Sequence, residues 1–241
     1  MAPRILLLQA RNADDPARED ECRSFAAKAL LPVDQFVAHD LLSGPPSMQK
    51  VNTCDALMVG GSGDYYVSKK NLPEFPATMD FFRRIVSMGY PVLASCFGFH
   101  LLAQALGGEV IYDLETMEVG TFDLTLSDAG AEDELFCCMP RHFPAQLGHK
   151  DRVVRLPGCC VSLASSQKVS HQAFRVLGQP VWATQFHPEL DVEENRKRFR
   201  QYVAGYATLM SDEEREETLS KFRDSPETSA LIRRFLEINF K

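Results

Sequence analysis

Cys96 is the side chain in this sequence best placed to act as a nucleophile. It follows an apolar run at Val92–Ser95, which predicts a buried strand, and precedes residues 98–106, which predict a helix. A strand, a sharp turn and a helix form a nucleophile elbow, in which the turn lifts the side chain above the sheet. The helix N-terminus stabilises a thiolate, and the Phe97 N–H could bind the oxyanion formed when that thiolate attacks a carbonyl group. Taken alone, Cys96 could equally be a small buried hydrophobic residue.

A possible base for this nucleophile follows a second strand. Residues 181–186 predict a strand that delivers His187 at its end, with Glu189 two positions further on. Residues two apart on extended backbone share a face, and Pro188 stiffens the link between them. A carboxylate bound to one imidazole nitrogen fixes the tautomer of the other, which can then take the thiol proton. Taken alone, the pair could be a solvated histidine beside a surface glutamate.

Together these segments resemble the class I, or triad, glutamine amidotransferases. The resemblance rests on PVLASCFGFH at 91–100 and QFHPE at 185–189, with a spacing of 91 positions from Cys96 to His187 (187 − 96). Two more segments agree in order. Residues 57–63 resemble the glycine loop that supplies an oxyanion N–H group, and residues 147–153 resemble a segment that seats glutamine. The nearest type is the glutaminase domain of guanosine monophosphate synthetase.

The resemblance implies a role for each matching residue. Cys96 would form a γ-glutamyl thioester, and His187 would deprotonate Cys96 and then protonate the leaving ammonia. Glu189 would orient His187, so these three residues are the expected catalytic triad. The backbone N–H groups of Gly61 and Phe97 would form the oxyanion hole.

Four further positions match the family's glutamine pocket: His100, Gly148, His149 and Asp151. Relatives usually have Gln at position 100 and Ser at position 148, and also Gly at position 94 and Pro at position 62. The expected bond-breaking groups are intact, whereas the pocket is altered. The choice between glutamine and another γ-glutamyl compound therefore stays open.

The order of the predicted elements indicates an α/β fold. Strands alternate with helices through the first 106 residues, which predicts an open, mostly parallel sheet with helices on both faces. The predicted strands are 5–9, 56–59 and 92–95, and the predicted helices are 14–31, 77–88 and 98–106. Short strand-like stretches at 118–126 and 153–163 then predict an antiparallel extension and the return strands of the sheet.

The sequence suggests a catalytic domain at 1–190 and a helical C-terminal extension at 191–241 packed on the same domain. The last helix is predicted to start at residues 224–227, with Ser225 as its cap and Pro226 in its first turn.

The composition excludes several classes of function. The chain has 241 residues and a net charge of −7 without a basic run, which argues against nucleic-acid binding and against an anionic membrane surface. No apolar stretch approaches the roughly 20 residues that span a bilayer. Seven cysteines, an odd number without a CxxC motif, favour a reducing cytoplasm. The adjacent pairs Cys137–Cys138 and Cys159–Cys160 do not suit a tetrahedral metal site, so we expect neither metal nor cofactor.

Three functions remain open at this point. The first is hydrolysis of the glutamine γ-carboxamide, with the ammonia passing to a separate synthetase subunit, because the 52 residues after Glu189 leave no room for a synthetase domain (241 − 189). The second is a free-standing hydrolase of γ-glutamyl amides or peptides. The third is a non-catalytic binding module, against which the intact Cys, His and Glu set argues.

Overall fold

The computed structural model describes residues 2–206 and 209–240. Its strands are β1 (Ile5–Ala10), β2 (Phe36–Asp40), β3 (Ala56–Ser62), β4 (Val92–Ser95), β5 (Glu109–Tyr112), β6 (Glu118–Leu126), β7 (His142–His149), β8 (Asp151–Arg155), β9 (Cys160–Ser165), β10 (Ala173–Val176) and β11 (Val181–Thr184). Its α-helices are α1 (Ala17–Ala29), α2 (Met48–Val51), α3 (Phe75–Ser87), α4 (Phe97–Ala105), α5 (Asp128–Glu132), α6 (Val192–Gln201), α7 (Val203–Tyr206), α8 (Asp212–Ser220) and α9 (Pro226–Asn239).

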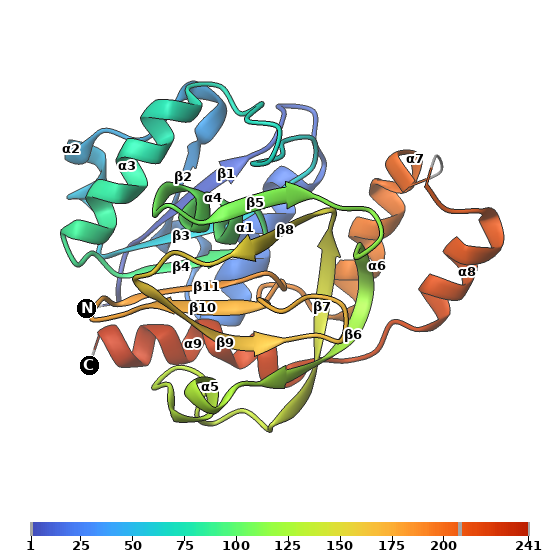
Figure 1. Cartoon of the computed structure of the whole chain (residues 1–241). Coiled ribbons are helices and arrows are strands. Elements are labelled where there is room, and N and C mark those ends of the chain that lie inside the picture. The colour runs from blue at the N-terminus through green and yellow to red at the C-terminus, as the bar shows by residue number, and fades with distance from the viewer. Residues whose placement is uncertain (1, 207–208, 241) are drawn as a thin grey trace.

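The main sheet is open and mixed, as Figure 1 shows. In the described part of the chain its order is β2-β1-β3-β4-β11-β10-β9-β6-β7. The strands from β2 to β11 pair in parallel, and those from β11 to β7 pair antiparallel. The expected α/β sheet with an antiparallel extension is therefore confirmed. β11 is the strand at which the two halves meet, and it lies directly beside β4.

Alternation along the buried strands creates a core on each face of the sheet. Leu6 and Leu8 of β1 belong to the core that α3 and α4 cover, whereas Ile5 and Leu7 belong to the core that α1 and α9 cover. Successive side chains of a strand point to opposite faces, so a strand buried on both faces must be apolar throughout. This explains why the β1 sequence, ILLLQA, lacks the alternation of a half-exposed strand.

One predicted stretch is wrong. Residues 153–163 do not form one strand, because the chain turns at Pro157, where the Cys160 N–H donates to the Pro157 carbonyl oxygen at 3.0 Å. β8 precedes this turn and pairs with β5 in a separate two-stranded sheet, whereas β9 follows it and joins the main sheet. A proline and a glycine in succession are a strong turn signal, and they separate the two strands here.

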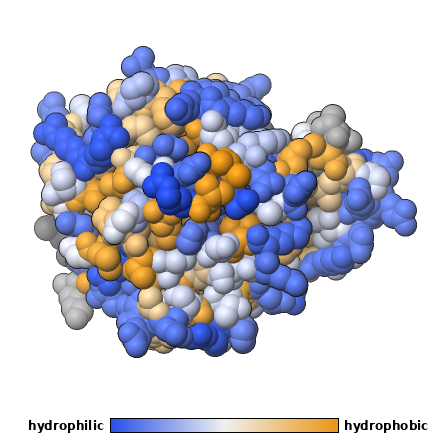
Figure 2. All heavy atoms as spheres, in the orientation of Figure 1, coloured by the Kyte–Doolittle hydropathy of each residue, from blue (hydrophilic) through white to orange (hydrophobic). Residues whose placement is uncertain are grey.

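The C-terminal helices take two routes, visible in Figure 1. α6 begins at a capping box, in which the Asp191 side chain accepts from the Glu194 N–H while the Glu194 side chain accepts from the Asp191 N–H. α8 projects away from the sheet and has no buried residue, and Figure 2 shows the outer part of this arm as largely hydrophilic. α9 returns along the sheet and packs on α1 and β7.

The predicted start of α9 is correct, but its predicted cap is not. Pro226 lies in the first turn, yet the Ser225 side chain makes no capping hydrogen bond. Instead, the Ser225 hydroxyl accepts from Gln146 Nε2 at 3.0 Å. The Ser225 hydroxyl therefore binds a side chain of β7 instead of a backbone N–H of its own helix.

Within residues 2–206 and 209–240, no helix has the length and apolar character needed to cross a membrane.

Close packing of α4 against the sheet predicts the effect of enlarging Gly98. A Cβ at this position would lie 2.7 Å from the Val59 Cβ, so the helix must shift. We expect Gly98→Ala to lower the free energy of unfolding by about 1–3 kcal/mol, as overpacking of a core does. Gly158→Ala is the matched control, because no atom lies within 4 Å of its added Cβ. Equal stability of the two variants in urea denaturation would contradict this packing.

Candidate active site

Cys96 occupies a strained turn between β4 and α4. Its backbone has φ 49° and ψ −97°, a positive φ that a non-glycine residue adopts only at a cost of about 1–3 kcal/mol. Hydrogen bonds enforce it, because the Cys96 N–H donates to the Thr184 carbonyl oxygen at 2.8 Å and the first turn of α4 follows at once. The predicted elbow is therefore present in the backbone, and it aims the thiol away from the strand.

His187 and Glu189 form a buried pair beside this turn. His187 Nδ1 lies 2.7 Å from Glu189 Oε1, and the exposed fractions of the two residues are 4% and 0%. Cys96 lines the same cavity as His187 and is close enough to raise the pKa of its imidazole. The structure thus brings together the three residues of the expected triad, in the order Cys96, His187, Glu189.

Charge in this pair is mutually stabilised. Burial opposes an imidazolium at His187, but Glu189 and Cys96 outweigh it and raise the pKa of His187 to about 9. Burial likewise opposes a carboxylate at Glu189, but His187 and then Arg198 outweigh it and lower the pKa of Glu189 to about 2. At neutral pH the pair is therefore an imidazolium beside a carboxylate, ready to give a proton to a leaving group.

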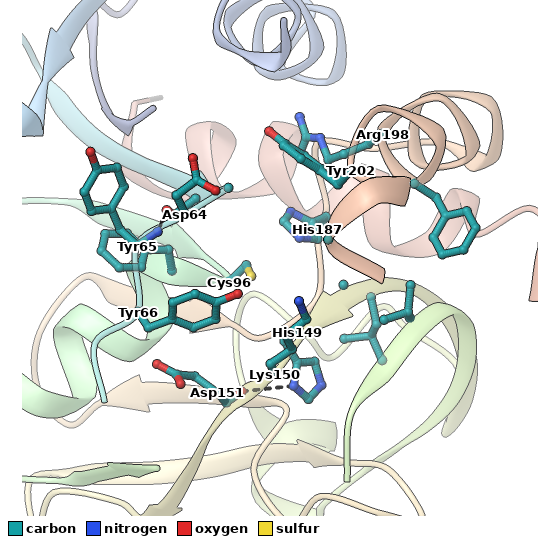
Figure 3. Close-up of a pocket in the computed structure, with 18 of the residues that line it drawn as sticks. Asp64, Tyr65, Tyr66, Cys96, His149, Lys150, Asp151, His187, Arg198 and Tyr202 are labelled. Carbon is teal, nitrogen blue, oxygen red and sulfur yellow. Dashed lines mark hydrogen bonds between the residues drawn. The ribbon is translucent and has the colours of Figure 1, made fainter. Parts of the chain in front are cut away.

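A cavity of about 330 Å³ opens over Cys96. Figure 3 shows Cys96 in its middle, with His187, Arg198 and Tyr202 on one side and Tyr66, His149 and Asp151 on the other. This size lies near the lower end of the range for small-molecule sites, roughly 300–1,000 Å³. Polar groups converge here around one nucleophilic atom, which is the arrangement expected of a catalytic pocket.

The two predicted oxyanion donors are placed differently. Phe97 is the first residue of α4, where a backbone N–H has no partner within its own helix and is available to an anion. Gly61 lies against the base, because a Cβ there would sit 3.0 Å from His187 Cε1, but its N–H donates to Glu21 Oε1 at 3.1 Å. The oxyanion role of Gly61 stays a prediction, and it requires this peptide group to turn from Glu21 toward the cavity.

The predicted glutamine-binding residues line the cavity, but several of their polar groups are engaged within the protein. The Asp151 carboxylate accepts from the Ser68 hydroxyl at 2.6 Å and from the Ser68 N–H at 3.0 Å. His149 uses one ring nitrogen on the Asp151 carbonyl oxygen and the other on Glu118 Oε2, both at 3.0 Å. Gly148 is half-buried at the cavity wall. Substrate binding by these residues stays a prediction.

His100 is buried and faces Gln185. Its Nε2 lies 2.7 Å from Gln185 Oε1, and its exposed fraction is 3%. The expected contact of His100 with a substrate also stays a prediction.

Five charged or polar residues in or beside the site were not among the residues predicted from the sequence: Arg11, Asp15, Glu21, Arg198 and Tyr202. Arg11 lies just after β1 and binds Glu21 Oε1 at 2.8 Å, Asp15 at 3.1 Å and the Tyr202 hydroxyl at 2.6 Å. Arg198 lies on α6, one turn before Tyr202, with its NH1 atom 3.5 Å from Glu189 Oε1. α6 thus carries one residue beside the triad glutamate, Arg198, and ends at Tyr202, which binds the Arg11–Glu21 pair at the glycine loop. The signal for Arg11 was its place at the carboxyl end of a parallel strand, where α/β sheets carry their sites.

A profile of the family described as glutamine amidotransferase class-I matches residues 38–202, more than half of the chain. This chain belongs to the class I glutamine amidotransferase family. The family match includes β3, β4 and β11 and extends through α6 to Tyr202, so it covers the cysteine, the histidine and the glutamate described above.

Curated relatives agree with this assignment over part of the chain. The chain is 36% identical over 100 residues to one of the subunits of GMP synthase (glutamine-hydrolysing) from Methanocaldococcus jannaschii, an alignment that covers 42% of this chain and 51% of that protein. It is 28% identical over 143 residues to GMP synthase from Aquifex aeolicus, which covers 59% of this chain and 26% of that protein. The chain thus spans about a quarter to a half of the length of these relatives.

Solved structures share the fold over nearly the whole chain. A glutamine amidotransferase from Thermotoga maritima superposes with a TM-score of 0.75 at 20% identity, over 99% of this chain and 98% of that one. A glutamine amidotransferase from Methylobacillus flagellatus gives a TM-score of 0.70 at 18% identity, over 98% of this chain and 95% of that one. At these identities the likeness establishes the fold alone.

The His187–Glu189 pair predicts a change in protonation when the glutamate loses its charge. In Glu189→Gln the largest favourable influence on the imidazolium is gone while burial persists, so the pKa of His187 should fall from about 9. Nitrogen chemical shifts of His187 followed by NMR as a function of pH should show the ring losing its proton at a lower pH in the variant than in the wild type. The same midpoint in both would contradict the coupling.

The same pair should make stability depend on pH. The folded-state pKa of His187 lies above the ordinary 6.5, so its contribution is complete below pH 6.5 and is lost as pH rises through about 9. We expect the stability advantage of the wild type over His187→Gln to shrink across that window in urea denaturation. A constant advantage between pH 6 and 10 would rule out this linkage.

Pairing of Arg11 with Glu21 predicts a large cost when one partner is removed. Both side chains are at most 1% exposed, so Glu21→Ala leaves a buried guanidinium without its main counter-charge. We expect a loss of about 3–5 kcal/mol in the free energy of unfolding. Glu19→Ala on the same helix is the control, because the Glu19 side chain is 80% exposed and its loss should cost about 0.5 kcal/mol or less. Similar losses in the two variants would show that the Arg11 pair is not stabilising.

Proposed function

We propose that this protein hydrolyses the γ-carboxamide of glutamine through a γ-glutamyl thioester on Cys96 and releases ammonia. The observation that carries the proposal is the meeting of a strained strand-to-helix cysteine with a buried histidine and glutamate in one cavity. Membership of the class I glutamine amidotransferase family supports the same reaction.

The first half of the reaction forms the thioester. The Cys96 thiolate attacks the γ-carbonyl carbon, and the oxyanion that develops accepts from the Phe97 N–H at the start of α4. His187, held by Glu189 at 2.7 Å, gives its proton to the amide nitrogen, and the carbon–nitrogen bond breaks to release ammonia. The positive φ of Cys96 holds the thiol at the turn, so less reorganisation is needed for attack.

The second half returns the enzyme to its starting state. Neutral His187 takes a proton from water, which attacks the thioester carbon, and the carbon–sulfur bond breaks to give glutamate and the Cys96 thiolate. Glu189 remains ionised throughout, because its charge stabilises the imidazolium each time it forms. Arg198, whose NH1 atom lies 3.5 Å from Glu189 Oε1, balances that buried negative charge.

A separate synthetase subunit is the proposed recipient of the ammonia. The relative from M. jannaschii is itself one of the subunits of a glutamine-hydrolysing GMP synthase. We also propose that residues 1–190 form the catalytic domain and that residues 191–241 are a helical C-terminal extension packed on it, since Arg198 and Tyr202 of that segment line the cavity. A cytoplasmic location remains part of the proposal.

A free-standing hydrolase of γ-glutamyl amides or peptides is the second candidate. The observation that favours it is the altered pocket, in which His100 and the Asp151 carboxylate are bound to other residues of the protein. A pocket that does not dedicate these groups to free glutamine can admit a larger leaving group than ammonia.

The decisive experiment compares substrates with the purified chain. Ammonia release from glutamine is measured beside amine release from γ-glutamyl amides and dipeptides, with Cys96→Ala as the control. Turnover of glutamine, alone or on addition of a synthetase subunit, supports the proposal. Rapid turnover of γ-glutamyl peptides with little release from glutamine supports the second candidate, and turnover of every compound by Cys96→Ala would exclude both.

The assigned roles predict the order of loss among triad variants. Cys96→Ala should abolish hydrolysis while the fold is retained, because no other group can form the thioester. His187→Ala should lower kcat more than Glu189→Gln, because the histidine transfers protons and the glutamate only orients and stabilises it. Steady-state kinetics on variants checked by circular dichroism measures this, and a reversed order would contradict the roles.

A further inference from the structure

Gln185 lies directly under the sulfur of Cys96. It is fully buried, at 0% exposure, and its Nε2 is 3.9 Å from Cys96 Sγ. Gln185 and His187 lie in the segment that directly follows β11, and Phe186 between them belongs to the core on the α1 and α9 side. The segment that carries His187 therefore also presents an amide to the Cys96 sulfur.

The amide of Gln185 is oriented by His100. Gln185 Oε1 lies 2.7 Å from His100 Nε2, and a carbonyl oxygen can only accept, so this ring nitrogen carries the proton. Burial lowers the pKa of His100 to about 4, so the ring is neutral at pH 7 and carries one proton, for which the Gln185 carbonyl oxygen and the Asp151 backbone are the two partners. With Oε1 held by that proton, the two N–H groups of the amide are left to point toward the sulfur.

Thiolate formation favours this orientation of the amide over the reverse one. A flipped amide would place its carbonyl oxygen against the negatively charged sulfur and repel it, whereas the observed one places an N–H donor there. The other ionisable groups around the pair are His187 and Tyr66 near Cys96, and His149 and Asp151 near His100. Gln185 contacts both the sulfur and His100, and so links the two.

We propose that Gln185 is a further catalytic residue, whose amide N–H stabilises the Cys96 thiolate, and that His100 is the positioning residue that aims it. The inference rests on the proposed nucleophilic role of Cys96. Relatives usually have Gln at position 100. In this proposal His100 acts on the nucleophile, through Gln185, instead of on the substrate.

Alkylation of Cys96 tests this inference without a substrate. The full-length protein is treated with iodoacetamide at pH 6.5, and modification of the Cys96 peptide is followed by mass spectrometry, because the other cysteines also react. We expect Gln185→Met to lower the rate constant at Cys96 about tenfold, near the lower end of what a hydrogen bond to a charged group contributes. Gln172→Met is the matched control, since Gln172 is an equally buried glutamine on the adjacent strand segment that binds Glu118.

Variants of His100 separate positioning from a general structural effect. His100→Gln keeps an N–H donor for Gln185 Oε1 and should alkylate within about twofold of the wild type, whereas His100→Leu removes the donor and should slow alkylation several-fold. If Gln185→Met does not fold, the two His100 variants still test the inference. Equal slowing in His100→Gln and His100→Leu, or a wild-type rate in folded Gln185→Met, would overturn the inference.

The two readouts keep this inference separate from the proposed function. Alkylation that depends on Gln185 in a protein that hydrolyses no γ-glutamyl compound supports the inference and refutes the proposed function. Hydrolysis of γ-glutamyl compounds together with an alkylation rate of Cys96 that does not depend on Gln185 refutes the inference and supports the proposed function.

Discussion

The parallel pairing of β4 with β11 is the interaction on which the site depends. Cys96 ends one of these strands and His187 follows the other, and the register places Ser95 opposite Thr184. Side chains 91 positions apart in sequence (187 − 96) thereby emerge at the same edge of the sheet. The Cys96 N–H bond to the Thr184 carbonyl oxygen extends the pairing by one residue, so the ladder itself holds the strained turn. Loss of this pairing would separate Cys96 from His187.

Buried ion pairs also stabilise the site. Glu189 binds His187 and lies near Arg198, while Glu21 binds Arg11 beneath the glycine loop. Tyr202 lies at the end of the helix that carries Arg198 and accepts from Arg11, so α6 connects the two groups. Such groups stabilise the fold only as complete pairs, because a buried charge without its partner is costly. The helices after residue 190 are therefore part of the site, although the catalytic motifs precede them.

Family membership and local geometry answer different questions about this protein. Membership accounts for the sheet that positions the cysteine, the histidine and the glutamate. The contacts of the structure show how the rest of the pocket is arranged. His100 binds Gln185 and the Asp151 carboxylate binds Ser68, so both stabilise the walls of the pocket.

The sequence by itself determined the fold class, the family and the candidate triad, because these depend on local patterns. An apolar strand, a cysteine at a sharp turn and a helix are adjacent in sequence, and so are His187 and Glu189. Only the tertiary structure revealed the engagement of the Gly61 N–H by Glu21, the exchange of the Ser225 cap for Gln146, and the contact of Gln185 with Cys96. Each of these joins groups from separate elements of the fold. A buried polar side chain forms a hydrogen bond with whichever partner the packing brings within reach, and the spacing of residues along the chain does not specify that partner.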